Sequence, residues 1–95
     1  MVRHIVLFKI KPEFKAEIPQ LVQAFYGMLG RVEGLTALES GADFLGSERS
    51  YDLALVATFV DREALAAYQT HPAHLPVKKR MHEVREASVA CDFEL

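Results

Sequence analysis

The stretch Val2–Ile10, which reads VRHIVLFKI, predicts more of the fold than any other part of the chain. It is rich in β-branched and aromatic residues and contains neither proline nor glycine, so we expect a β-strand. Side chains alternate between the two faces of a strand. One face carries His4, Val6, Phe8 and Ile10, and the other carries Arg3, Ile5, Leu7 and Lys9. Because both faces are apolar at the centre, both sides of the sheet need cover.

Outward from this strand, helical and strand patterns follow one another along the chain. A first helix, with Gly30 as its expected end, is predicted by apolar residues at helical spacing. These residues are Ile18, Leu21, Val22, Phe25 and Met28. The remaining elements are expected as a strand at 35–43, a loop at 46–50, a strand at 53–59, a helix at 61–69, a short helix at 76–84 and a last strand at 85–93. Gly41 indicates a β-bulge or a close backbone approach in the second strand.

The order of these elements predicts an α+β fold of the ferredoxin-like βαββαβ type. It has a four-stranded antiparallel sheet in which the first and last strands are neighbours and the helices cover one face. The other face then needs a partner, and a second copy of the chain would bury it face to face in a C₂ homodimer. Residues 1–95 are interpreted as a single domain.

Composition excludes several classes of protein. The net charge is −2, with 11 basic and 13 acidic residues, and no basic field suited to nucleic acid is present. The short basic run at 78–80 is interpreted as a solvated helix face. One cysteine excludes an internal disulfide and fits a reducing compartment. We find no signal peptide and no long apolar segment, so the sequence predicts a cytoplasmic protein without a membrane partner.

Polar chemistry is concentrated in one stretch, Tyr68–His74, which reads YQTHPAH and holds two of the four histidines. Pro72 disfavours helical dihedrals at His71, so the preceding helix should end near position 70. His74 then follows a forced break. We interpret His74 as a general base and Tyr68 as a hydrogen-bond donor to a developing oxyanion. The alternative is structural, with His74 tied to backbone carbonyls and Tyr68 a core aromatic. His71 is expected to serve the local turn or the dimer surface.

Further candidate pocket residues come from the strands. His4 needs a polar partner on its apolar strand face, and Asp92 on the neighbouring last strand could orient it or pair with Arg3. Cys91 is interpreted as a small buried apolar residue. The expected pocket walls are Val6, Phe8 and Leu55. No histidine spacing supports a metal site, and no cofactor is expected.

Taken together, these features resemble the stress-responsive A/B barrel (Dabb) family over essentially the whole chain. The residues that carry the resemblance are His4–Lys9, Gly41, Tyr51–Val56 with Phe59, Tyr68–His74 and Cys91–Phe93. The resemblance implies a dimeric α+β barrel. A plant polyketide cyclase of this family, which makes olivetolic acid, uses a tyrosine and a histidine in the same Tyr-x-x-His-Pro-Ala-His arrangement.

The resemblance to that cyclase assigns four positions of this chain. Tyr68 and His74 match the cyclase's catalytic residues, while His4 and Asp92 match other polar positions of its pocket. Leu53 stands where the cyclase has a further histidine, so the pocket is expected to be more apolar there. Two functions remain open. One is a small cofactor-free enzyme, a cyclase, lyase or oxygenase, acting on an apolar or ketone-like molecule. The other is a non-catalytic, stress-related dimer that binds a small molecule.

Overall fold

The computed structural model describes residues 1–95. Its elements follow one another as β1 (Val2–Ile10), a 3₁₀ helix η1 (Pro12–Glu17), α1 (Ile18–Tyr26), β2 (Leu35–Ala42), β3 (Leu53–Phe59), α2 (Arg62–Tyr68), α3 (Leu75–Val84) and β4 (Arg85–Glu94). The strand boundaries expected from the sequence agree with these to within a residue. The two helices expected at 61–69 and 76–84 are α2 and α3, and the break at Pro72 separates them.

The four strands form one antiparallel sheet in the order β2-β3-β1-β4, which is the ferredoxin-like arrangement. The first and last strands are neighbours, as the sequence predicted. In the register of the two central pairs, His4 lies opposite Ala57 of β3 and Asp92 of β4. A residue near the start of the chain is thereby placed beside one near its end.

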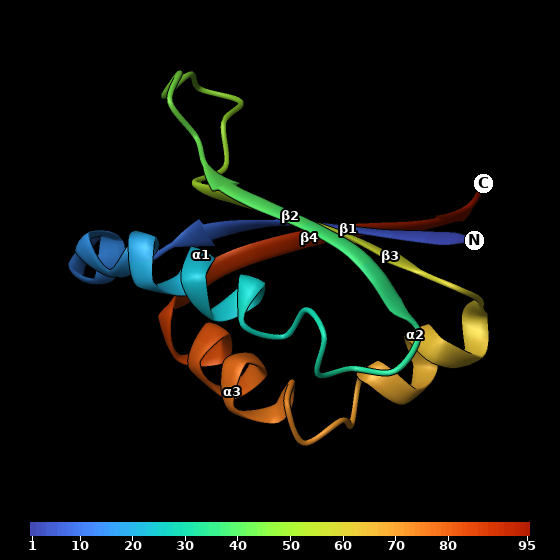
Figure 1. Ribbon diagram of the computed structural model, residues 1–95. Helices are drawn as coiled ribbons and strands as arrows, with labels where there is room; N and C mark the ends of the chain where they lie inside the picture. The colour runs from blue at the N-terminus through green and yellow to red at the C-terminus, as the bar shows by residue number, and fades with distance from the viewer.

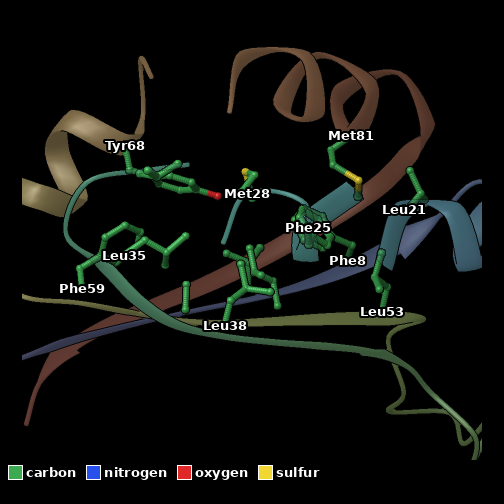
Figure 2. Close-up of a cluster of buried hydrophobic side chains, with 14 of the residues drawn as sticks. Phe8, Leu21, Phe25, Met28, Leu35, Leu38, Leu53, Phe59, Tyr68 and Met81 are labelled. Carbon is green, nitrogen blue, oxygen red and sulfur yellow. The ribbon is translucent and has the colours of Figure 1, made fainter. Parts of the chain in front are cut away.

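All the helices lie on one side of the sheet, and the other side is bare (Figure 1). The core fills the space between the two layers, with apolar side chains of β1 and β3 facing those of α1, α2 and α3 (Figure 2). Phe8 of β1 stacks on Phe25 of α1 with ring centroids 5.8 Å apart. Phe59 lies against Tyr68 with centroids 5.0 Å apart. These contacts anchor α1 and α2 to the sheet.

The start of α2 follows from local sequence chemistry. The carboxylate of Asp61 accepts a hydrogen bond from the backbone N–H of Ala64 at 2.8 Å, so Asp61 is the N-cap of α2. Gly34 has a φ of +82° and lies directly against α2, where a Cβ would come within 2.5 Å of the Cβ of Ala64. A glycine at this position lets α2 approach the turn before β2 closely.

Two expectations from the sequence were wrong in detail. Gly41 marks neither a bulge nor a close approach, because a Cβ there would meet open space and its φ is not positive. The bulge of β2 lies instead between Leu35 and Ala37. The first helix ends at Tyr26, before Met28, which is buried from the turns that follow. Met28 continues the apolar spacing of α1 because the turns after the helix also place it on the core side, so the spacing alone did not reveal where the helix ends.

The bare side of the sheet is apolar at its centre. Ile5, Leu7, Val56, Val89, Cys91 and Phe93 alternate with the core-facing residues of their strands and form what we call the bare face. Leu7 is 36%, Val89 48% and Phe93 40% exposed in the single chain. Cys91 is also exposed, so its expected burial was wrong for one subunit. None of the helices has both the length and the apolar composition of a transmembrane segment.

Candidate active site

The turn between α2 and α3 is held by its own histidines. The Nδ1 of His71 accepts a hydrogen bond from the backbone N–H of Ala73 at 3.0 Å, and its Nε2 lies 3.1 Å from a carboxylate oxygen of Glu33. The carbonyl of His71 accepts from the N–H groups of His74 and Leu75. His71 therefore serves the local turn, which was one of the two roles expected for it.

His74 and Tyr68 form a stacked pair. Their ring centroids are 3.8 Å apart and their planes differ by 12°. The Nδ1 of His74 lies 2.9 Å from the backbone carbonyl oxygen of Tyr68. A carbonyl only accepts, so Nδ1 carries the proton and donates it to this bond. In the neutral ring, the lone pair is then on Nε2, where it can accept a proton from elsewhere.

Burial sets the protonation states of both residues. His74 is 8% exposed and Tyr68 1% exposed. Loss of solvent lowers the pKa of His74, and the Coulombic effects of Lys78 and His4 lower it further, against the raising effect of its bonds to the backbone carbonyls. Burial also raises the pKa of Tyr68 to about 12. At neutral pH the pair is therefore an uncharged base beside a protonated hydroxyl.

His4 approaches the same pair from the sheet. Its Nδ1 is hydrogen-bonded to a carboxylate oxygen of Asp92 on β4. Asp92 therefore pairs with His4 and not with Arg3, the other partner considered from the sequence. The ring of His4 meets that of Tyr68 edge-on, with centroids 6.1 Å apart. Because the carboxylate of Asp92 accepts from Nδ1, this bond fixes the orientation of the His4 ring and therefore the direction of its Nε2. Asp92 lies behind His4 and does not itself line the cavity described next.

A cavity of about 210 Å³ opens between the sheet and the helices. The structure brings to it six residues that the sequence singled out, namely His4, Val6, Phe8, Leu55, Tyr68 and His74. Phe25 and Met81 complete its apolar wall from α1 and α3. Leu53 is buried in the core and is not part of this wall. The volume is below the roughly 300–1,000 Å³ usual for drug-sized ligands, which suits a small molecule.

Sequence reasoning missed the polar mouth of this cavity, formed by Gln69, Lys78, His82, Arg85 and Ser88. The signal was present. Positions 74, 78 and 82 are spaced by four, which puts them on one face of a helix. Positions 88, 90 and 92 alternate onto one face of the last strand. The basic run at 78–80 was therefore wrongly interpreted as wholly solvated, because Lys78 lines the cavity.

The arrangement can support acid–base chemistry on a bound molecule. It offers one neutral imidazole, one protonated phenol and a second, carboxylate-bound imidazole in an apolar surrounding. The hydroxyl of Tyr68 makes no hydrogen bond to the protein, and Figure 2 shows it pointing away from α2 toward the interior. No three His, Cys, Asp or Glu side chains come together in an arrangement that could hold a metal ion.

Comparison with known proteins identifies the family of this chain. The chain matches the model of the stress responsive A/B barrel domain over residues 2–95. An uncharacterized protein of Streptomyces coelicolor is 34% identical over 77 residues, which is 78% of this chain and 79% of that protein.

Solved structures show the same fold. A protein of unknown function from Bacteroides fragilis, described as dimeric and ferredoxin-like, is 26% identical with a TM-score of 0.88, over 99% of this chain and 95% of that one. A hydroxynitrile lyase from Passiflora edulis has a TM-score of 0.85 at 18% identity, over 99% of this chain and 92% of that one, a likeness of fold alone. The family match spans nearly every residue, and the chain belongs to the stress-responsive A/B barrel (Dabb) family.

Proposed function

We propose that this protein is a small cofactor-free enzyme of the lyase or cyclase type that acts on an apolar, ketone-like molecule. The observation that carries the proposal is the buried Tyr68–His74 pair at the cavity. A general base must be in its unprotonated form at the working pH. The lowered pKa of His74 meets this condition.

The proposed reaction begins with proton abstraction next to a carbonyl. The Nε2 lone pair of His74 takes the C–H proton, and the bonding electrons move into an enolate. Tyr68 donates its O–H to the oxygen that gains the charge, which is worth most where water is excluded. The enolate then attacks a second carbonyl carbon in a cyclisation. In a lyase, the steps run in reverse: His74 takes the proton of a hydroxyl group, the carbon–carbon bond breaks to give a carbonyl and an enolate, and the enolate carbon takes up a proton. In either case, the proton on His74 returns to the product and regenerates the neutral base.

His4 is assigned a substrate-positioning role together with Asp92. Its ring lies edge-on to Tyr68 on the cavity wall, and the carboxylate fixes its orientation. Val6, Phe8 and Leu55 supply the apolar surface that excludes water from the reacting atoms.

The active form is proposed to be a homodimer joined through the bare face. That face exposes Leu7, Val89 and Phe93, an apolar surface of the kind that marks an interaction site. The loop between β2 and β3 projects on this side of the sheet (Figure 1) and carries Phe44, which is 97% exposed. The Bacteroides fragilis relative is described as dimeric, which supports the same assembly here.

One observation favours the second candidate, a binding protein without chemistry. His71 and His74 each use one ring nitrogen to hold the turn, so the histidines have a structural role whether or not a reaction occurs. The cavity and the dimer would then serve storage or sensing of a small molecule. The two candidates differ in one respect only: whether His74 removes a proton from the ligand.

Exchange of α-protons for deuterium in a neutral ketone tests this difference. We would incubate 4-phenylbutan-2-one with the protein in D₂O and follow loss of the proton signals by NMR. Wild type should accelerate exchange over buffer, and His74→Asn should abolish the acceleration. Asparagine keeps a donor in the place of Nδ1, so the bond to the Tyr68 carbonyl survives while the base is lost.

The matched control is His71→Asn. Its side-chain oxygen can replace the Nδ1 acceptor for Ala73, and the residue lies outside the cavity. This variant should exchange at the wild-type rate. Exchange no faster than in buffer, together with saturable ketone binding, would favour the binding protein instead.

A further inference from the structure

The mouth of the cavity is cationic. Lys78 and His82 of α3 and Arg85 at the start of β4 line it, and no aspartate or glutamate does. This contrasts with the chain as a whole, which has 13 acidic and 11 basic residues. The local charge is therefore opposite in sign to the net charge of the protein.

These cationic groups are not neutralised by the protein. The guanidinium of Arg85 donates to the hydroxyl of Ser88 and lies 3.5 Å from the Nδ1 of His82. The ammonium of Lys78 has only the backbone carbonyl of Gln69, at 3.4 Å. None of these residues takes part in an ion pair.

Arg80, on another face of the same helix, shows the ordinary arrangement. Its guanidinium pairs with carboxylates of Glu17 at 2.5 Å and Glu83 at 3.2 Å. Lys78 and Arg85 lack the carboxylate partners that Arg80 has, and a bound anion at the cavity mouth would complete their coordination. A guanidinium and an ammonium converging on one opening suit a carboxylate, which can accept from both.

We propose that the ligand of this cavity is an amphipathic carboxylate, with its anionic group at the mouth and its apolar body inside. The placement of the apolar body beside His74 rests on the proposed function. The anion site extends that proposed function by naming the substrate class. A carboxylate held by Lys78 and Arg85 fixes which end of the molecule enters first. The body then lies against Val6 and Leu55, with its reacting carbon on the side of His74.

A pair of isosteric probes tests the anion site separately from any chemistry. We would titrate ¹⁵N-labelled protein with 3-phenylpropanoate and with 3-phenylpropanamide, which differ in charge and scarcely in shape. Shifts of the backbone amides of Gln69, Lys78 and Ser88 report binding at the mouth. The carboxylate should bind about tenfold more tightly than the amide, the low end of what a charged hydrogen bond contributes.

Variants localise the preference. Arg85→Gln and Lys78→Gln should each reduce the preference for the carboxylate severalfold and leave the affinity of the amide unchanged. Lys79→Gln removes the same charge from an exposed neighbour outside the cavity and should keep the full preference. Two separate variants and the control guard against loss of folding in any one of them.

Equal affinity of the two probes, or equal loss of preference in Lys79→Gln, would overturn the anion site. Ketone exchange by the wild type is unaffected by that outcome, because 4-phenylbutan-2-one is neutral. Conversely, carboxylate preference without any ketone exchange would support the anion site and contradict the proposed chemistry. The two proposals can therefore fail independently.

Discussion

Substituting Gly34 with alanine should disturb the packing of α2, whose last residue is Tyr68. Gly34 has a φ of +82°, and its would-be Cβ lies 2.5 Å from the Cβ of Ala64 and 3.3 Å from a methyl group of Val60. The glycine carbonyl also accepts the backbone N–H of Val60 at 2.9 Å, so the segment cannot simply move away. Either the helix or the turn has to shift.

The cost has two separable parts. A left-handed conformation costs an alanine about 1–2 kcal/mol, and forcing a methyl group into a packed contact costs about 1–3 kcal/mol more. We therefore expect Gly34→Ala to lower the free energy of unfolding by about 2–5 kcal/mol, a large share of the roughly 5–15 kcal/mol of a typical domain. Gly30 is the matched control, because its φ is +87° but nothing lies within 4 Å of its would-be Cβ.

Urea unfolding followed by circular dichroism measures both effects. Gly30→Ala should show the conformational part alone. Adding Ala64→Gly to Gly34→Ala should restore about 1–3 kcal/mol beyond the sum of the single changes, since it removes the clashing methyl group. Equal destabilisation by Gly30→Ala and Gly34→Ala, with no coupling to Ala64, would refute the close approach of α2.

Three further outcomes are expected. Val56→Glu places a charge on the bare face, and sedimentation equilibrium should then show a folded monomer where the wild type is expected to be a dimer; an undiminished dimer would place the interface elsewhere. Tyr68→Phe should slow ketone exchange by roughly 10²–10³, the usual loss for one oxyanion donor, and an unchanged rate would remove the hydroxyl from the mechanism. Because burial lowers the pKa of His74, its contribution to stability is present above the ordinary histidine pKa of about 6.5 and is lost as the pH falls below it. Wild type should thus lose more stability than His74→Asn between about pH 7.5 and pH 5.5 in urea titrations, and equal losses would contradict this assignment.

The fold was predictable from the sequence because strand patterns and topology follow from local rules. Val2–Ile10 and Leu53–Phe59 contain no helix breakers or strand breakers and form strands with those boundaries. The Asp61 side chain caps α2, and aspartate before a run of helix formers is a local signal of a helix start. Gly41 misled because a glycine in a strand has several causes, and only the neighbours in space distinguish them.

The candidate site was predictable in part. Tyr68 and His74 were singled out because polar residues concentrate in their stretch and because both match positions of the plant cyclase, whereas their ring stacking depends on how α2 and α3 pack. The basic mouth was missed because Lys78 looked like its exposed neighbour Lys79 within one charged run. Burial separates the two lysines, and burial depends on which helix face meets the sheet. Exposure of Cys91 likewise depends on whether a second subunit is present.

The pH dependence of ketone exchange, compared with the titration of His74 itself, tests the proposed role of His74 as the base most directly. The catalysed rate at low ketone concentration reports the pKa of the base in the free protein. We would follow the ring signals of His74 by NMR in the same buffers, assigning them with His74→Asn. If His74 is the base, the rate falls as the pH drops through a midpoint that lies below the ordinary histidine pKa and coincides with the NMR midpoint. A rate that follows a different midpoint, or that persists in His74→Asn, would contradict this role for His74.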